Sequence, residues 1–275
     1  MTVSVSGTPD SLVRGEEQFA PPPVLTIAGS DSSGGAGIQA DLKTFHQLGV
    51  YGQSAVTLIT AQNTCGVTAV HLLPPELVIQ QIDAVLTDIG ARAIKTGALG
   101  SPELIRAVTE RLRGSRIPLV VDPVLISKHG HALASPAAAV ALQELLLLAT
   151  VIMPNRHEIA LLAGRPADTT EQAHDAAQSL IDRGVAAVLL KGAGEGADDV
   201  LITRTDEIVL PGLTIVTRHL HGTGCTYAAA LTAHLARGLS LPAAARYAKA
   251  FIAHAIVTAP GLGSPSGYGP VNHWA

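Results

Sequence analysis

The sequence predicts an α/β protein in which a mostly parallel central sheet lies between layers of helices. Short apolar runs alternate with longer amphipathic or alanine-rich segments along most of the chain, which is typical of strands joined by crossover helices. The 275 residues are 47% hydrophobic and 15% charged, so the chain has enough apolar side chains for a sizeable core. No internal repeat or low-complexity linker divides the body, and we therefore expect residues 21–275 to form a single domain.

The first half of the chain alternates strands and helices from residue 24 onward. A buried strand is followed by a glycine-rich loop and a helix, and the pattern then repeats. The helix at 75–87 is amphipathic, with Leu77, Ile82, Val85 and Leu86 on one side. The predicted strands are 24–28, 55–60, 93–95 and 118–121, and the predicted helices are 37–48, 75–87 and 102–113.

The second half continues in the same way and adds a short hairpin near an edge of the sheet. An alanine-rich run after Cys225 has high helix propensity and predicts one more helix. In such folds ligands bind beyond the carboxyl ends of the strands, so motifs at those ends are candidate site residues. The predicted helices are 136–148, 158–163 and 171–183, the strands are 150–153 and 187–190, and the hairpin is 200–203 with 207–210.

Composition excludes several classes of partner. The net charge of −4 and pI near 6.2 give no basic field for nucleic acid or an anionic membrane. Residues 1–20 lack the features of a signal peptide and predict a flexible tail. The apolar run 142–153 is too short to span a bilayer and is closed by Pro154. The two cysteines make no disulfide framework, which fits a reducing cytoplasm.

The segment His221-Gly222-Thr223-Gly224-Cys225 is the motif around which we organise the site. Two glycines allow a tight turn, and the helix that follows presents unpaired N–H groups and partial positive charge at its start. Such a terminus can bind phosphate or a developing oxyanion. A close-packed turn with a buried thiol is the alternative interpretation.

Two motifs follow the first two strands. The loop 29–37, beginning at Gly29, matches neither the P-loop nor the dinucleotide fingerprint, which argues against a dinucleotide-dependent oxidoreductase. It can surround a polar small molecule. Asp41 follows one turn into the next helix, where a solvated acid is the favoured alternative. Gln62 offers two donors and one acceptor to a heterocycle, or simply belongs to a turn.

Three later strand ends carry charged or polar side chains. Asp122 precedes a proline and can hold magnesium, although Asp-Pro also opens ordinary turns. Asn155 and Glu158 have the spacing of a helix capping box, and Glu158 is also a candidate second acid near the metal. Lys191 leaves a buried strand into glycines and can reach a nucleotide phosphate, or extend its ammonium to solvent.

Taken in order, these motifs resemble the ribokinase-like superfamily, and more closely the hydroxymethylpyrimidine and phosphomethylpyrimidine kinases of thiamine biosynthesis. The resemblance runs from about residue 24 to the C-terminus. The long segment 26–44 makes it highly specific. The other matching segments are 62–64, 121–124, 154–155 with Glu158, 190–192, 221–226 and 269–271 with His273.

The resemblance implies a ribokinase-like three-layer α/β/α sandwich with a small β flap near the substrate. It implies ATP- and Mg²⁺-dependent phosphorylation of 4-amino-5-hydroxymethyl-2-methylpyrimidine and then of its monophosphate. An edge hairpin and a cysteine-poor surface are compatible with a homodimer. The implied pyrimidine contacts are Gly29, Asp41, Gln62 and Val124, the ATP contacts Lys191 and Asn155, the metal ligands Asp122 and Glu158, the anion hole Gly222, Thr223 and Gly224, and the candidate base Cys225.

The chain departs from the family pattern at two places. Ala98 follows Lys95-Thr96-Gly97 where the family usually has methionine, which opens the pyrimidine pocket. Ala193 and Gly194 follow Lys191-Gly192 where the family often has Gly-His, which changes the detail of the ATP contacts.

Two alternative functions and one chemical question stay open at this point. A pyridoxal kinase phosphorylates a hydroxymethyl group on a similar ring. A non-catalytic pyrimidine-binding regulator would keep the fold, although the retained Asp122, Glu158, Lys191 and Cys225 argue against it. A helix N-terminus lowers a thiol pKa from about 8.5 to roughly 3.5–7.5, whereas bound phosphates raise it, so base catalysis by Cys225 depends on their balance.

Overall fold

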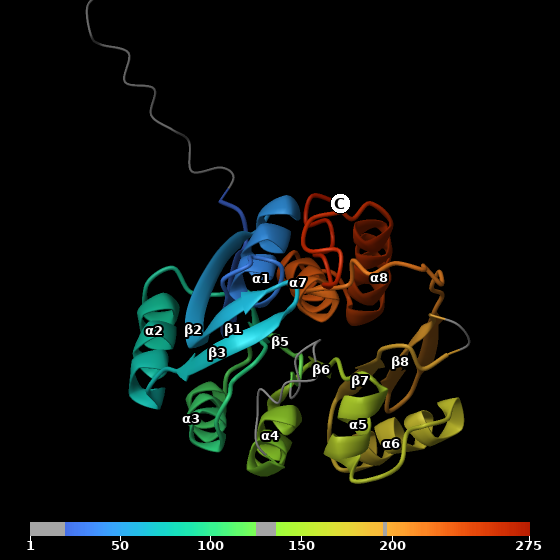
Figure 1. Ribbon diagram of the computed structural model, residues 1–275. Coiled ribbons are helices and arrows are strands. Elements are labelled where there is room, and N and C mark those ends of the chain that lie inside the picture. Colours follow the sequence, from blue (N-terminus) through green and yellow to red (C-terminus); the bar gives the residue numbers. More distant parts are fainter. Residues whose placement is uncertain (1–19, 125–135, 195–196) are drawn as a thin grey trace, which may run out of the picture.

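The structure is a computed structural model that describes residues 20–124, 136–194 and 197–275. The predicted tail, apart from Ala20, lies outside the described residues. The rest forms one sheet with helices on both faces, and the predicted α/β class is confirmed (Figure 1).

The sheet has nine strands within the described residues, in the order β3-β2-β1-β4-β5-β6-β7-β8-β9. The strands from β2 to β7 in this order pair in parallel, whereas β3, β8 and β9 are antiparallel at the two edges. The strands are β1 Pro23–Asp31, β2 Tyr51–Asn63, β3 Gly66–Leu72, β4 Ala93–Thr96, β5 Leu119–Val121, β6 Val151–Ile152, β7 Ala187–Leu190, β8 Asp199–Thr203 and β9 Glu207–Leu210.

The hairpin predicted at 200–203 and 207–210 is β8–β9. The strand predicted at 55–60 is longer at both ends, and its second half pairs with β3, which the sequence pattern did not reveal. Five of the seven residues of β3 are exposed, so its sequence lacks the alternation of a half-buried strand. Together the end of β2 and β3 form the small flap.

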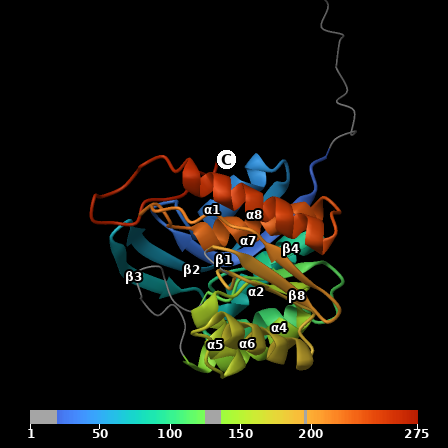
Figure 2. The ribbon, with the colours of Figure 1, turned by 90° about the vertical axis from the view of Figure 1, so that its right-hand side faces the viewer.

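Helices cover the two faces unequally (Figures 1 and 2). The predicted helices are all present to within a few residues at each end, and α8 is an additional one that we had not predicted. One face carries α1 Gly37–Gln47, α7 Thr223–Ala236 and α8 Leu241–Val257. The other carries α2 Pro75–Thr87, α3 Pro102–Leu112, α4 Pro136–Leu148, α5 Arg156–Ala163 and α6 Thr170–Asp182.

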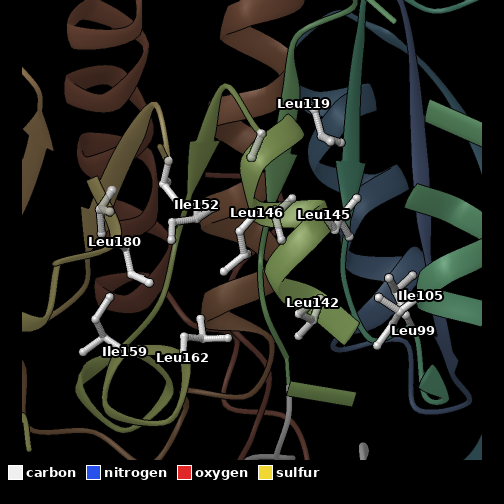
Figure 3. Close-up of a cluster of buried hydrophobic side chains, with 14 of the residues drawn as sticks. Leu99, Ile105, Leu119, Leu142, Leu145, Leu146, Ile152, Ile159, Leu162 and Leu180 are labelled. Carbon is white, nitrogen blue, oxygen red and sulfur yellow. The ribbon is translucent and has the colours of Figure 1, made fainter. Parts of the chain in front are cut away.

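The core under the second group of helices is built from leucine and isoleucine side chains (Figure 3). Leu142, Leu145 and Leu146 of α4 face the sheet, and Ile152 of β6 lies beside them. Each such side chain contributes about 1.5–3 kcal/mol when fully buried. Because β5 and β6 are short and buried in this core, the loops at their carboxyl ends are held on a firm base.

The core under the first group is made largely of alanine. Ala228 and Ala230 of α7 and Ala244 and Ala248 of α8 are all inaccessible to solvent, and the small side chains allow the two helices to approach closely. This packing fixes α7, and therefore the position of its N-terminus, against the sheet. No helix in the described part of the chain combines the length and the apolar character that crossing a membrane requires.

Candidate active site

A cavity of about 600 Å³ opens at the carboxyl ends of the parallel strands. Its walls come from the loops after β1, β4, β5, β6 and β7, the end of the flap, and the start of α7. Eleven of the twelve site residues expected from the sequence line it, and Asp41 is the exception. The eleven are Gly29, Gln62, Asp122, Val124, Asn155, Glu158, Lys191, Gly222, Thr223, Gly224 and Cys225.

The turn 221–225 opens α7 as predicted. Gly222 is the N-cap residue and has φ +78°, a left-handed conformation that suits glycine, and it provides no side-chain cap. A Cβ at Gly222 would lie 1.8 Å from the Gly35 carbonyl oxygen, so this turn packs directly on the glycine-rich loop after β1. No side chain caps the first turn of α7, although the Thr223 N–H donates to the Leu220 carbonyl at 3.3 Å, and residues 223–225 line the cavity.

The Cys225 thiol lies in the first turn of α7 and lines the cavity. Burial raises its pKa to about 11, while the Lys95 ammonium and a hydrogen bond from the Gly37 backbone act in the opposite direction. The thiolate that the helix N-terminus alone would favour is therefore not the resting form. In this site desolvation outweighs the field of the helix.

Lys191 connects two carboxylates across the cavity floor. Its Nζ lies 2.9 Å from Asp122 Oδ1 and 3.8 Å from Glu158 Oε2. The other oxygen of Asp122, Oδ2, is buried and has no hydrogen-bond partner among the described residues. A Cβ at Gly224 would lie 3.5 Å from that oxygen, so the start of α7 borders this charged group. The two Asp122 oxygens thus differ, with one paired to Lys191 and one available.

Glu158 also caps α5. Its backbone N–H donates to Asn155 Oδ1 at 2.9 Å, and its own Oε2 accepts from the Asn155 backbone N–H at 2.8 Å, which confirms the predicted capping box. Burial raises the pKa of the Glu158 carboxyl to about 7, Lys191 lowers it, and Asp122 raises it further. The same carboxylate that caps α5 therefore also lines the cavity.

Asp41 lies behind the cavity wall rather than on it. It is not the solvated acid that its position suggested, because it is fully buried and pairs with Lys95 at 2.8 Å and with the Thr26 hydroxyl at 2.6 Å. Lys95, also fully buried, does line the cavity. The sequence analysis did not single out Lys95, although its position at the end of a strand was the available signal.

A group of three side chains joins the β1 loop to the α7 turn, and the sequence analysis missed one of them, Asp31, and the contacts among the three. Asp31 Oδ2 lies 2.8 Å from His221 Nε2, and Gln62 Nε2 lies 3.1 Å from the same ring nitrogen. Asp31 also accepts from the backbone N–H of Ser33 and Ala36, both at 2.8 Å. The signal was the Asp-Ser-Ser-Gly-Gly sequence, in which an aspartate commonly bonds to the backbone two residues on.

The C-terminal segment 268–271 is hydrogen-bonded to both the α7 turn and the flap. His221 donates its backbone N–H to the Gly269 carbonyl at 3.0 Å and accepts from the Val271 N–H at 3.2 Å. The Tyr268 N–H donates to the Thr64 carbonyl in the flap at 2.7 Å. The segment therefore spans from the flap to the α7 turn.

The opposite end of the cavity is apolar with one ion pair. Asp199 accepts from the Gly192 backbone N–H at 2.8 Å and from Lys249 Nζ at 2.7 Å, which ties the loop after β7 to α8. The apolar lining there comes from Leu213, Ile215, Ile252, Ala253 and Ile256, none of which the sequence analysis named. This end offers the kind of wall that accepts the face of a flat heterocycle.

The two departures from the family pattern lie in or beside the cavity. Ala98 lines it, and its carbonyl accepts from the Thr57 hydroxyl at 2.6 Å. Ala193 is buried, and a Cβ at Gly194 would lie 2.5 Å from Cβ of Asp198. Ala98 therefore leaves space in the cavity, whereas residues 193–194 form a tight turn beside it.

Comparison with known proteins gives concordant matches. A family model described as phosphomethylpyrimidine kinase matches residues 31–272. The chain is 47% identical over 256 residues to the hydroxymethylpyrimidine/phosphomethylpyrimidine kinase of Rhizobium meliloti, covering 91% of this chain and 96% of the relative. It is 41% identical to a chloroplastic thiamine biosynthetic bifunctional enzyme of Arabidopsis thaliana, covering 97% of this chain and 53% of that protein.

A solved structure is similar in fold as well. The pyridoxal kinase from Staphylococcus aureus, in complex with AMP-PCP and pyridoxal, has a TM-score of 0.83 and 38% identity to this chain. The match covers 93% of this chain and 95% of that one.

Proposed function

The chain belongs to the phosphomethylpyrimidine kinase family, and from this membership we propose that its cavity transfers phosphate from ATP to 4-amino-5-hydroxymethyl-2-methylpyrimidine and then to the monophosphate. It is a phosphotransferase of thiamine biosynthesis. The observation that carries the assignment of roles is the gathering of eleven expected residues around one cavity, although they are spread from position 29 to position 225.

The start of α7 is the proposed cradle for the phosphate in transfer. Phosphoryl transfer depends on positioning and on neutralising charge more than on covalent chemistry. Backbone N–H groups at Gly222, Thr223 and Gly224 are proposed to meet the oxygens of the transferred group, the Thr223 N–H sharing its hydrogen with the Leu220 carbonyl, 3.3 Å away. Lys191 adds a positive charge beside them. Donors fixed in this way need no rearrangement when the charge develops.

Cys225 is the proposed acceptor of the proton that the alcohol loses. A thiol with a pKa of about 11 is a weak acid, so its thiolate, once formed, is a strong base. Lys95 lies close enough to stabilise that thiolate, and the thiolate in turn raises the Lys95 pKa. We propose that the Cys225 thiol first releases its proton to solvent, and that the resulting thiolate then takes the proton of the alcohol. The Lys95 ammonium supplies the positive charge that stabilises this thiolate, whereas the Asp41 carboxylate opposes it.

The substrate ring is proposed to lie at the flap end of the cavity. Gly29, Gln62 and Val124 line this end, and Lys95 separates Asp41 from the cavity. One oxygen of Asp41 is buried without a hydrogen-bond partner among the described residues, which leaves it able to accept from a substrate amine if Lys95 shifts. The apolar end, with Asn155 and Lys191 between the two, is proposed for ATP.

Magnesium fits the carboxylates at the floor. The described ranges hold no group of three or more His, Cys, Asp or Glu side chains placed to bind a metal ion by themselves. Mg²⁺ in phosphotransferases, however, takes one or two carboxylates together with waters and substrate phosphates. The unpaired Asp122 Oδ2 is such a ligand, and Glu158 is the second. The ion would neutralise phosphate charge there.

Two further proposals concern the whole molecule. We propose a homodimer formed through the flap, because Ile59, Val70 and Leu72 on β2 and β3 are 45–50% exposed. We also propose a cytoplasmic location, which the two free cysteines fit. Sedimentation of the purified chain tests the first, and fractionation of its host cell tests the second.

The decisive experiment measures phosphate transfer from ATP with Mg²⁺ to the pyrimidine alcohol, to its monophosphate and to pyridoxal. We expect turnover of both pyrimidines, with the pyridoxal reaction much slower, because the curated relatives named above carry the pyrimidine activity. Faster turnover of pyridoxal would reassign the protein to that branch. Absence of transfer to all three would leave the binding regulator as the function.

A further inference from the structure

Asp31 is held as a carboxylate. Its two oxygens accept hydrogen bonds from the Ser33 and Ala36 backbone N–H groups at 2.8 Å, from the Gly35 N–H at 3.2 Å and from the Ser33 hydroxyl at 2.8 Å. Burial alone would raise its pKa, but the hydrogen bonds with His221 and Ser33 lower it. An ionised carboxylate accepts hydrogen bonds and has no proton to donate.

It follows that His221 carries a hydrogen on Nε2. That nitrogen lies 2.8 Å from Asp31 Oδ2, and both side chains are almost fully buried. The contact is a hydrogen bond only if the ring nitrogen donates. Neutral imidazole with its proton on Nε2 and the doubly protonated ring both satisfy this condition, so the conclusion holds for either charge state of His221.

The donor on His221 determines how the Gln62 amide is turned. Gln62 Nε2 lies 3.1 Å from His221 Nε2, which would bring two donors together. Turning the amide by half a rotation leaves its outline unchanged and brings the carbonyl oxygen against the imidazole N–H, whose one hydrogen it then shares with Asp31. In this orientation the NH₂ group of Gln62 is the end of the amide turned away from His221, and Gln62 lines the cavity.

The rest of Gln62 is already fixed. Its backbone N–H donates to Ser32 Oγ at 2.9 Å, and its carbonyl accepts from the same hydroxyl at 2.7 Å. The direction of the amide is therefore the main freedom that remains at this residue. An amide free to turn would bind a ring nitrogen or a ring N–H equally well, whereas a fixed amide discriminates between them.

We propose that Asp31 and His221 are positioning residues that fix the Gln62 amide with its NH₂ toward the substrate, so that Gln62 donates to an unprotonated ring nitrogen. The inference rests on the proposed function, since it assigns the ring that the cavity binds. It makes Gln62 the residue that rejects rings carrying N–H at that position. The cost of opposing two donors in a buried site is about 1–3 kcal/mol, which corresponds to roughly 5- to 150-fold in affinity.

The test compares two ligands by calorimetric titration: the 4-amino pyrimidine alcohol, and its 4-oxo analogue, whose ring carries an N–H. Gln62→Glu is the most direct variant, because a carboxylate still accepts from His221 but can only accept from the ring. We expect wild type to bind the amino compound more tightly than the oxo compound. In Gln62→Glu the ratio of the two Kd values should shift at least tenfold toward the oxo compound. An unchanged preference in Gln62→Glu would overturn the proposal.

A second pair of variants tests the positioning role. His221→Leu removes the donor and frees the amide, so the preference for the amino compound should fall about tenfold, whereas His221→Gln restores an N–H near the position of Nε2 and should recover it. Equal preference in all three proteins contradicts the role of His221. If His221→Leu does not fold, Asp31→Asn takes its place, because it removes the carboxylate that holds the hydrogen on His221 Nε2. Its preference for the amino compound should also fall, and an unchanged preference contradicts the positioning role.

The result also separates this inference from the proposed function. If wild type binds neither compound, the proposed function fails. If wild type binds the amino compound and transfers phosphate to it, but the variants keep its preference, only the positioning role fails.

Discussion

The Lys95 ammonium lies 2.8 Å from the Asp41 carboxylate, and neither side chain is exposed to solvent. Burial of two charges is costly unless they are paired and hydrogen-bonded. The Thr26 hydroxyl gives Asp41 one further hydrogen bond, and the Cys225 thiol lies within electrostatic reach of Lys95. The Lys95–Asp41 pair therefore affects both the stability of the fold and the pKa of the Cys225 thiol in the cavity.

Removal of one partner should unfold the protein more easily. We expect Lys95→Met to lower the free energy of unfolding by about 3–5 kcal/mol, because Asp41 is left as an unpaired buried anion. Urea denaturation measures this. The double variant Lys95→Met/Asp41→Leu should recover much of the loss. As a control, Arg113→Met breaks two exposed pairs, with Glu110 and Glu144, and should change the free energy of unfolding far less. If Lys95→Met and Arg113→Met lowered the free energy of unfolding equally, burial of the Lys95–Asp41 pair would not be the cause of the loss.

Substitution of Cys225 should affect turnover rather than binding. If the Cys225 thiolate accepts the proton of the alcohol, Cys225→Ala should lower kcat by about 10²–10⁴-fold while leaving the Kd of the pyrimidine close to that of wild type. Single-turnover kinetics and calorimetry measure the two quantities. Cys65→Ala is the matched control, because Cys65 is exposed and does not line the cavity. Wild-type turnover in Cys225→Ala would remove the thiol from the mechanism.

The two glycines of the α7 turn should respond differently to alanine. Gly222→Ala meets both a left-handed backbone and the Gly35 carbonyl at 1.8 Å, so it should lower the melting temperature and abolish activity. In Gly224→Ala the new methyl group lies in ordinary contact, 3.5 Å from Asp122 Oδ2, so the fold should survive. The methyl group nevertheless occupies the proposed phosphate position, and we expect kcat/KM for ATP to fall about 10²-fold. If Gly224→Ala were fully active, the transferred phosphate could not bind at the proposed position.

Glu158 should make stability depend on pH between 4.5 and about 7. Its pKa is raised in the folded chain from an ordinary 4.5 to about 7, so the folded state binds the proton more tightly than the unfolded state. The stabilisation that this proton provides is complete below pH 4.5 and is lost as the pH rises through 7. At about 1.4 kcal/mol for each tenfold change in proton affinity, the loss is at most about 3–4 kcal/mol.

Glu158→Gln isolates this effect. Thermal unfolding of wild type and variant in metal-free buffer from pH 4.5 to 8 should show the two stabilities diverging as the pH rises, with the variant gaining relative to wild type. Parallel curves would show that Glu158 is ionised in the folded protein throughout this range.

The sequence was sufficient for elements whose pattern is local. Buried strands such as Ala187–Leu190 and capped helices such as Arg156–Ala163 have apolar runs and end signals that can be recognised without knowledge of the fold. The edge strand β3 has no such pattern, because Val70 and Leu72 are exposed. Helix α8 was missed even though its alanines are buried.

Candidate site residues at strand ends were predictable because parallel strands bring their carboxyl ends to one edge. Pairings across the fold were not. Lys95 and Asp41 are separated by 54 residues, and Asp31 and His221 by 190, so no local spacing announces that they meet. The state of Cys225 was not predictable either, since the balance between burial and the helix field depends on the packed environment.

The segment near Tyr268 that bridges the flap and the α7 turn also affects how the protein assembles. The Thr64–Tyr268 and His221–Val271 contacts join parts of the chain that are distant in sequence or belong to different elements. Contacts of this kind form late, since closing long loops costs entropy before any contact compensates for it. We therefore expect the sheet to form before the flap and the turn are joined, and a molecule that contacts both to stabilise the last step of folding.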